Sequence, residues 1–283
     1  MSLGYNRYKL GGYIYNLLKK YPANSESGNL RVYFFPAGKT TATMNNPILL
    51  KLGKRLSQLV NMIEQRYSII WDCCCDHGLL GMWLLQREIA ERVVFVDVLS
   101  HQMTLLEQEL QQYFPADNYN WQVLCQDLRE VQVPTAAPQL FVIAGVGGDK
   151  TIEFIHSLSA AAKGQPFDLL VCSVHGNYPV RKTLIDLGFS LLEEQIIFEN
   201  KRFYEAIYVS SNPGQHISNT GSSMWDWSNP KHHNYLNKIL VHYRKKAAAD
   251  PGKYSVVVDQ YEKLLQLATP VPEDGPIVKE SGR

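Results

Sequence analysis

Three aspartates, Asp72, Asp97 and Asp127, each follow a short apolar run, and they are spaced 25 and then 30 residues apart. Apolar runs of this length indicate buried strands, and the stretches between them carry apolar residues at helical spacing. Strands that alternate with helices form a parallel sheet that is covered on both faces. Because parallel strands end at the same edge of a sheet, the sequence predicts that the three carboxylates lie side by side.

Later apolar runs extend this sheet and then change its character. Residues 140–143 and 169–172 are two further predicted strands, with a helix between them. Residues 191–198 and 203–209 are separated by only four residues, so they must pair antiparallel, because a parallel crossover needs about a dozen. Five parallel strands followed by an antiparallel hairpin is the order of class I methyltransferases. The predicted fold is therefore a Rossmann-like α/β sheet of that kind, unlike a nicotinamide-dependent dehydrogenase.

Helical patterns lie before and after the sheet. Asn45-Asn46-Pro47 and the apolar spacing that follows predict a first helix of about four turns, and Ser100 is the predicted cap of a later helix. After a stretch rich in Ser, Asn, Gly and Pro, two amphipathic segments broken at Asp250-Pro251-Gly252 predict a helical hairpin, either packed on the domain or projecting from it. The predicted organisation is an N-terminal extension (1–43), a methyltransferase domain (44–212), a linker with the helical hairpin (213–268) and a flexible tail (269–283).

Composition excludes several classes of function. No uncharged apolar run approaches the roughly 18 residues of a membrane span, and the N-terminus lacks a signal pattern, so we expect a cytoplasmic protein without a membrane partner. The chain has 28 basic and 27 acidic residues, a net charge of +1. A nucleic-acid partner would therefore need a local basic patch.

The cysteines do not form a metal motif. Of the five cysteines, Cys73, Cys74 and Cys75 are adjacent and lie close to His77. Neighbouring side chains on an extended strand point to opposite faces, and no C-x-x-C pair occurs elsewhere, so we expect no metal site. Small residues at a crowded strand end are the favoured interpretation.

The aspartates at the strand ends suit a nucleoside. Asp97, after the second strand, can accept from both hydroxyls of a ribose, and Asp127 can accept from an adenine amino group. Asp72 is expected near the amino-acid end of S-adenosylmethionine. That cofactor carries no phosphate, and the chain has no G-x-G-x-x-G fingerprint for NAD or FAD. Any single aspartate could instead be a turn residue or a helix cap, but three in register favour function.

Several stretches resemble one family, the bacterial tRNA (adenine-22-N1) methyltransferases. Residues 72–81, D-C-C-C-D-H-G-L-L-G, are similar to the family motif D-I-G-S-D-H-A-Y-L-P, and residues 143–148, I-A-G-V-G-G, to I-A-G-M-G-G. Tyr204-Glu205-Ala206-Ile207 resembles the family's late Y-E-I, and the resemblance spans roughly residues 48–268. The departures are Cys74 for a glycine, Gly81 for a proline, and Ser173-Val174-His175 for Q-P-N.

The resemblance implies methyl transfer from S-adenosyl-L-methionine to adenine N1 in tRNA. It implies a catalytic role for Asp76, with Gly145 and Gly147 letting the backbone approach the base; the alternative for Asp76 is a helix N-cap. His77 is interpreted as hydrogen-bonded within the turn. The predicted cofactor-binding residues are Asp72, Cys74, Asp76, His77, Asp97, Val98, Gln126, Asp127, Leu128, Ala144 and Gly145.

The C-terminal helical hairpin is basic, and it is the predicted RNA-binding element. Its predicted RNA-binding residues are Lys231, Lys238, Arg244, Lys245, Lys246 and Lys253. A basic helical face is often only solvated surface, but this one belongs to an appendage with no other evident task. Two alternatives stay open: a class I methyltransferase that acts on a small molecule or protein, and a catalytically silent protein that binds the cofactor and RNA. We expect a monomer or a weak dimer.

Overall fold

The structure, a computed structural model, describes residues 52–135 and 138–268. The chain divides into two compact units, Met1–Gly53 and Lys54–Arg283, and the fold described below is that of the second. The predicted extension, the predicted helix start at residues 45–47 and the predicted tail lie outside the described residues. The prediction of one first helix of about four turns is wrong in its described part, because residues 52–53 are not helical and the helix there, α2, spans only Lys54–Met62.

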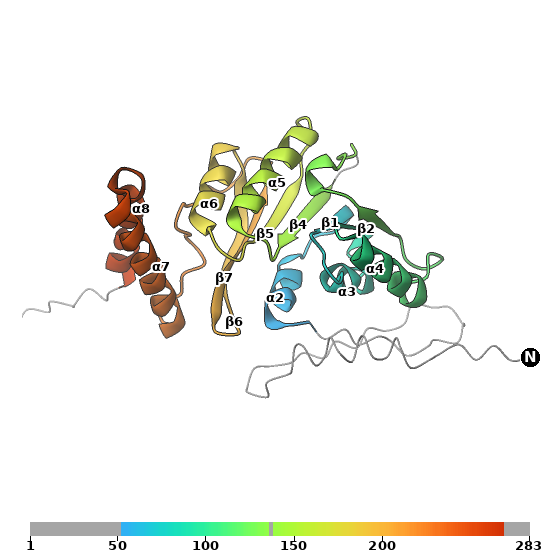
Figure 1. Cartoon of the computed structure of the whole chain (residues 1–283), viewed down its shortest axis with the longest axis horizontal. Coiled ribbons are helices and arrows are strands. Elements are labelled where there is room, and N and C mark those ends of the chain that lie inside the picture. The colour runs from blue at the N-terminus through green and yellow to red at the C-terminus, as the bar shows by residue number, and fades with distance from the viewer. Residues whose placement is uncertain (1–51, 136–137, 269–283) are drawn as a thin grey trace, which may run out of the picture. The chain divides into compact units, whose positions relative to one another are not determined.

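A seven-stranded sheet in the order β3-β2-β1-β4-β5-β7-β6 forms the centre of this unit (Figure 1). Strands β1 to β5 pair parallel, whereas β7 pairs antiparallel with both β5 and β6. This confirms the predicted α/β sheet with a C-terminal antiparallel hairpin. The strands are β1 (Tyr67–Cys73), β2 (Ala90–Asp97), β3 (Trp121–Cys125), β4 (Gln139–Ala144), β5 (Asp168–Cys172), β6 (Ser190–Glu199) and β7 (Arg202–Ser210).

Helices cover both faces of the sheet. The chain moves outward from β1 to β3 and then outward from β4 in the opposite direction, so crossovers of one hand put the two sets of helices on opposite faces. Figure 1 shows α5 and α6 on the face opposite α3 and α4. The helices are α2 (Lys54–Met62), which contacts α3 and the hairpin, α3 (Leu79–Gln86), α4 (Ser100–Tyr113), the 3₁₀ turn η1 (Leu128–Glu130), α5 (Gly148–Ala161) and α6 (Asn177–Asp186).

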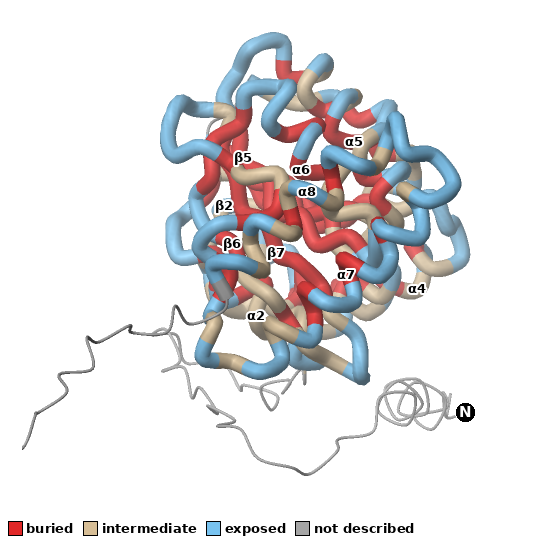
Figure 2. The backbone as a smooth tube through the Cα atoms, turned by 90° about the vertical axis from the view of Figure 1, so that its left-hand side faces the viewer, coloured by how far each residue is buried: buried red, intermediate tan, exposed pale blue. Residues whose placement is uncertain are grey.

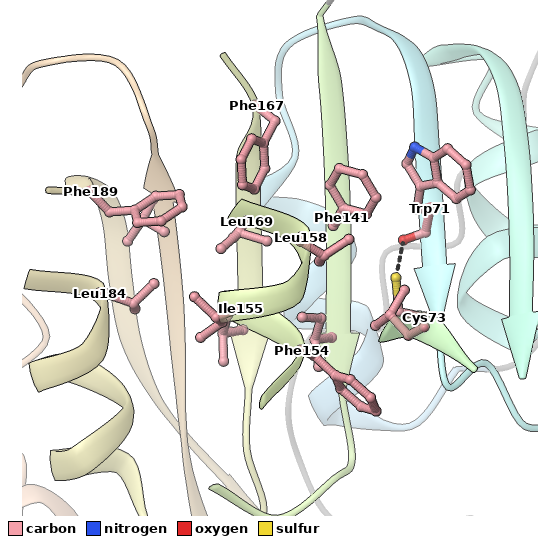
Figure 3. Packing of buried hydrophobic residues seen from close by; sticks show 14 of the residues in the cluster. Trp71, Cys73, Phe141, Phe154, Ile155, Leu158, Phe167, Leu169, Leu184 and Phe189 are labelled. Carbon is pink, nitrogen blue, oxygen red and sulfur yellow. Dashed lines mark hydrogen bonds between the residues drawn. The ribbon is translucent and has the colours of Figure 1, made fainter. Parts of the chain in front are cut away.

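Aromatic rings pack against one another along one face of the sheet, beside the buried residues of α5 and α6 (Figure 3). Trp71 on β1 stacks on Phe141 on β4, with ring centroids 5.2 Å apart. Phe167 packs edge-on against Phe141 at 5.6 Å and against Phe189 at 5.5 Å. Figure 2 shows how burial varies along the chain: positions on the strands are buried, and positions in most connections are exposed. These rings fix the spacing of β1 and β4, two of the strands whose ends carry the predicted site, and of the segment that leads into β5.

One predicted cap is wrong. Helix α4 has its N-cap at Leu99, and Ser100 is its first residue. The Leu99 N–H donates instead to Oδ1 of Asp97 at 3.2 Å. This local hydrogen bond from a carboxylate to the backbone two residues later orders the start of the helix.

The two C-terminal helices, α7 (Pro230–Ala249) and α8 (Pro251–Ala268), form the predicted helical hairpin. The side chain of Asn229 accepts from the Lys231 N–H at 3.1 Å and caps α7. The hairpin packs on the domain and does not project from it. The ring of Tyr178 on α6 contacts the rings of Tyr243 and Tyr261, with ring centroids 5.9 and 6.1 Å apart. No described helix is long and apolar enough to cross a membrane.

A buried arginine, Arg181, connects the helical hairpin of α7 and α8 to the sheet. Arg181 on α6 is fully buried, and its guanidinium contacts Glu194 on β6 at 2.6 Å and Glu205 on β7 at 2.7 Å. Glu205 also accepts from the hydroxyl of Tyr235 on α7 at 2.8 Å. Oε1 of Glu194 accepts from the Ser223 N–H at 2.8 Å, which anchors the segment that leads into α7. The predicted linker is therefore held against the domain through charged hydrogen bonds.

Replacing Arg181 by methionine leaves two carboxylates buried without their cation. We expect Arg181→Met to lower the free energy of unfolding by about 3–5 kcal/mol. Urea denaturation monitored by tryptophan fluorescence measures the change. The matched control is Lys182→Met, because Lys182 is exposed and pairs only with exposed Asp186 at 3.0 Å, so it should change stability by less than about 1 kcal/mol. Equal effects of the two substitutions would contradict this assignment.

Candidate functional site

The turn between β1 and α3 has an unusual backbone. Cys74, Asp76 and Gly78 have positive φ angles of 55°, 51° and 66°. Left-handed backbone costs a residue with a Cβ roughly 1–2 kcal/mol, so Cys74 adopts at some cost the conformation that a glycine accepts freely. The turn therefore still forms, although Cys74 stands where the family that the chain resembles has a glycine. Gly78 is the N-cap position of α3 and no side chain caps that helix, so Asp76 is not its N-cap.

Asp97 ties this turn to the end of β2. Its Oδ2 accepts from the Asp76 N–H at 3.2 Å, while its Oδ1 accepts from the Leu99 N–H at 3.2 Å. The Cys75 N–H donates to the Val96 carbonyl at 3.2 Å, next to the same carboxylate. The ends of β1 and β2 are thus held together, as the sequence predicts.

Asp72 is the buried member of the acidic edge. It is 5% exposed, and its Oδ2 accepts from the Gly81 N–H at 2.8 Å. Burial raises the pKa of Asp72 to about 7, the Gly81 N–H opposes the rise, and the Asp97 carboxylate adds to it. A proline at position 81 would lack this N–H, and a Cβ there would lie 2.2 Å from Cε1 of Phe95. Both facts explain why glycine occupies this position.

All three aspartates act on one point of the turn. Burial, followed by the carboxylates of Asp97, Asp72 and Asp127, raises the pKa of the Cys74 thiol to about 12. The Lys150 ammonium opposes this rise. The thiol stays neutral near pH 7, so it offers neither a thiolate nucleophile nor a thiolate metal ligand.

Asp127 already has a cationic partner. Arg129 contacts its Oδ2 through Nη2 at 2.6 Å, and donates to Oδ1 through its backbone N–H at 2.9 Å and through Nε at 3.0 Å. These hydrogen bonds lower the pKa of Asp127 to about 2, so it is ionised at any working pH. A carboxylate has about four acceptor positions, which leaves one for a ligand.

The residues next to Asp97 and Asp127 differ in how far they are exposed to solvent. Val98 is 59% exposed and Leu99 57% exposed, although both are large and apolar. Gln126 is half-buried, and Leu128 is buried. Exposed apolar side chains beside a carboxylate suit a flat ring joined to a ribose.

The loop after β4 contains glycines of two kinds. Gly145 is exposed with φ 93°, whereas a Cβ on Gly147 would lie 2.9 Å from the ring of His175. A Cβ on Gly148 would lie 2.8 Å from the His175 carbonyl oxygen. Gly147 and Gly148 therefore let this loop pack against the loop after β5, and Gly145 is the glycine that is open to a ligand.

Comparison with known protein families identifies the domain that carries this edge of the sheet. A family model described as a methyltransferase domain matches residues 52–207. The chain belongs to this methyltransferase family. No sequence among curated proteins matches it.

Solved structures share the fold of this methyltransferase. TrmK of M. capricolum, in complex with S-adenosyl-homocysteine, is 14% identical with a TM-score of 0.59, over 77% of this chain and 99% of that one. The B. subtilis m1A22 tRNA methyltransferase TrmK is 17% identical with a TM-score of 0.58, over 77% and 97%. A protein of the NADB-Rossmann superfamily from Streptococcus agalactiae is 17% identical with a TM-score of 0.62, over 79% and 100%.

The acidic edge fits the cofactor of this methyltransferase, S-adenosyl-L-methionine. That molecule carries a sulfonium, an ammonium group, a ribose diol and an adenine, and carboxylates accept from or attract each of the first three. A cavity of about 330 Å³ at the opposite edge, lined by Gln65, Asp168 and Ser210 among others, contains none of the predicted residues. The carboxyl ends of the strands, and not this cavity, carry the chemistry that fits.

Sequence reasoning missed three arginines of the methyltransferase. Arg129 neutralises Asp127, Arg181 holds the hairpin, and Arg55 on α2 lies beside Gly145. Arg129 could have been found, because a basic residue two positions after a predicted turn aspartate can pair with it. Arg55 and Arg181 pair across long stretches of sequence and leave no local signal.

The raised pKa of Asp72 predicts how the stability of the methyltransferase depends on pH. The folded state holds a proton on Asp72 up to about pH 7, whereas the unfolded chain releases it near 3.8, so the free energy of unfolding falls as pH rises between these values. The difference of about 3 pKa units corresponds to about 4 kcal/mol.

We expect Asp72→Asn to remove this part of the pH dependence, because the amide oxygen still accepts from the Gly81 N–H and carries no charge. Urea denaturation of both proteins from pH 4 to pH 8 measures it. The assignment fails if both curves keep the same slope.

Proposed function

We propose that this methyltransferase transfers the methyl group of S-adenosyl-L-methionine to N1 of adenine in tRNA. The observation that carries the proposal is the extent of the likeness to TrmK: it covers 77% of the chain, whereas the family model ends at residue 207. The basic helices α7 and α8 lie beyond that residue. A tRNA methyltransferase needs such a surface in addition to its catalytic domain.

In this proposal the strand ends hold the cofactor. Asp97 accepts from the ribose hydroxyls with the lone pairs that its two backbone donors leave open, and Val98 covers the adenine. Asp127 accepts from the adenine amino group at its remaining position. Asp72 attracts the ammonium group from below the turn. The backbones of Cys74, His77, Gln126, Leu128 and Ala144 complete the site.

Asp76 is the proposed catalytic residue. Its side chain is 66% exposed, and its Oδ1 contacts Nδ1 of His77 at 2.9 Å, which supports a carboxylate that is oriented and open to a substrate. The cofactor supplies an electrophilic methyl group, and adenine N1 supplies an in-plane lone pair, so no strong base is needed. The adenine ring becomes cationic as the methyl group moves, and the Asp76 carboxylate stabilises that charge. Alignment of the two reactants can contribute about 7–11 kcal/mol.

The target base approaches through the loop after β4. Gly145 is exposed and has no Cβ, so its backbone can contact a flat ring. Gly147 contributes by keeping the loop packed against His175. N1 lies on the Watson–Crick edge, so a paired adenine must leave its helix before it reacts.

The proposed RNA surface comprises six of the seven Lys and Arg residues of α7 and α8, namely Lys231, Lys238, Arg244, Lys245, Lys246 and Lys253. All six are exposed, and Lys231 and Lys238 lie 5.0 and 5.1 Å from the ring centroids of Phe198 and Phe203. These contacts keep the two ammonium groups next to the β6–β7 hairpin. Arg244 pairs with Glu262 at 2.8 Å, an exposed contact that phosphate can replace. Burial lowers the pKa of His232 and His242, so these histidines add little charge near neutral pH.

The direct test is incubation of the protein with methyl-labelled cofactor and unmodified tRNA, followed by mass mapping of the RNA. We expect label on one adenosine as N1-methyladenosine. The control is the same tRNA with that adenosine replaced by guanosine. Label on a small metabolite or a protein, with none on tRNA, would support the alternative methyltransferase function.

The two aspartates nearest the reaction are expected to have separable roles. Asp97→Ala removes hydrogen bonds to a charged acceptor and should weaken cofactor binding about 10- to 100-fold. Asp76→Asn should lower kcat on the order of 100-fold with cofactor affinity kept, because asparagine tolerates the left-handed backbone and removes only the charge. Calorimetry with S-adenosyl-homocysteine and single-turnover rates measure both. The opposite pattern would reverse the roles assigned here.

A further inference from the structure

Arg55 is a cation on α2 that reaches the catalytic edge of the sheet. Its backbone N–H donates to Oε1 of Glu199 at 3.0 Å, and its guanidinium carbon lies 5.2 Å from the ring centroid of Tyr204. Both partners belong to the β6–β7 hairpin. The helix and the aromatic ring together fix the direction of the guanidinium.

The guanidinium points to the one open glycine of the loop after β4. A Cβ on Gly145 would lie 3.5 Å from Nη1 and 3.8 Å from Nη2 of Arg55, and among the described residues no other heavy atom beyond Gly145 and its two chain neighbours comes within 4 Å. The Gly145 N–H donates to the Cys172 carbonyl at 3.0 Å, so this glycine is fixed to the end of β5. Arg55 therefore faces the side of Gly145 that the proposed substrate approaches.

One nitrogen of this guanidinium has no acceptor. Nη1 of Arg55 is buried and makes no hydrogen bond to any residue that the structure describes, although the guanidinium as a whole also interacts with the Cys172 thiol and opposes the rise of its pKa. A buried donor on a charged group without an acceptor is costly, and native proteins rarely keep one without a reason. The missing acceptor is best supplied by a ligand that enters beside Gly145.

We propose that Arg55 binds the phosphate of the target nucleotide and so positions its base against Gly145. The inference rests on the proposed function. A guanidinium presents two parallel N–H donors to a phosphate, whereas a base edge offers it no matching charge. The base itself becomes cationic during methylation, so a second cation in contact with it would oppose the reaction. The phosphate of the same nucleotide carries the opposite charge and lies only a sugar away.

A structural role for Arg55 predicts a different outcome. The contact with Glu199 uses the backbone N–H, which any side chain at position 55 retains. Loss of the guanidinium therefore keeps this backbone hydrogen bond and removes only the contacts of the side chain with the Tyr204 ring and the Cys172 thiol. A phosphate contact, unlike a packing contact, changes the salt dependence of RNA binding.

The test compares the wild-type protein with Arg55→Gln and Arg55→Lys by measuring the Kd for tRNA at several salt concentrations. We expect Arg55→Gln to reduce the slope of log Kd against log salt by about 0.7 to 0.9, which is the value of one phosphate contact. Arg55→Lys should keep the slope and lose turnover, because lysine keeps the charge without the planar fork. Arg66→Gln is the matched control, since Arg66 is exposed and directly precedes β1 at the opposite edge of the sheet. An unchanged slope in Arg55→Gln, or an equal loss in Arg66→Gln, would overturn the proposal.

A second measurement separates this inference from the proposed function. With S-adenosyl-homocysteine present, adenosine 5′-monophosphate should bind the wild-type protein more tightly than adenosine, and Arg55→Gln should abolish the difference. Equal binding of the two ligands to the wild-type protein, or a difference that survives in Arg55→Gln, overturns the role of Arg55. Failure to methylate tRNA, with this difference intact, overturns the proposed tRNA function and leaves the phosphate contact standing.

Discussion

The carboxylate of Asp97 holds the catalytic edge together. Its two oxygens accept from the backbone N–H groups of Asp76 and Leu99, so one side chain fixes the turn after β1 and the start of α4. That turn contains two residues with a Cβ in left-handed backbone, which persist only when surrounding contacts determine them. The same carboxylate retains lone pairs for a ribose. In the proposed cofactor site, one group therefore both holds the turn and accepts from the cofactor.

Electrostatics divides the three aspartates into different roles. Asp127 is ionised because Arg129 donates hydrogen bonds to both of its oxygens, whereas burial raises the pKa of Asp72 to about 7. A buried carboxyl that is half-protonated near neutral pH can gain charge when a cation binds nearby. Three similar residues at one edge thus differ in charge because their surroundings differ in burial and in partners.

A second network connects the catalytic domain to the helical hairpin. Arg181 joins two strands of the antiparallel hairpin, and Glu205 passes the connection to Tyr235 on α7. Such a network is costly to build in a low-dielectric interior, but once it is complete it resists any change in geometry. It holds the proposed RNA surface in a fixed position relative to the sheet, and Arg55 on the other side of the hairpin faces the proposed path of the base.

The sequence by itself determined the order of strands and helices, the antiparallel hairpin, the helical hairpin and the aspartates at three strand ends. Those features follow from local periodicity and from the rule that parallel strands end at one edge. It failed at Ser100, because the helix begins one residue earlier than predicted, with Leu99 at the N-cap and its N–H bound to Asp97. Only the tertiary structure decided that Asp72 is buried against Gly81, that Asp127 is already paired, and that Arg55 reaches Gly145. These facts depend on contacts between residues far apart in the chain and on the exclusion of water, and neither is encoded in the spacing of residue types.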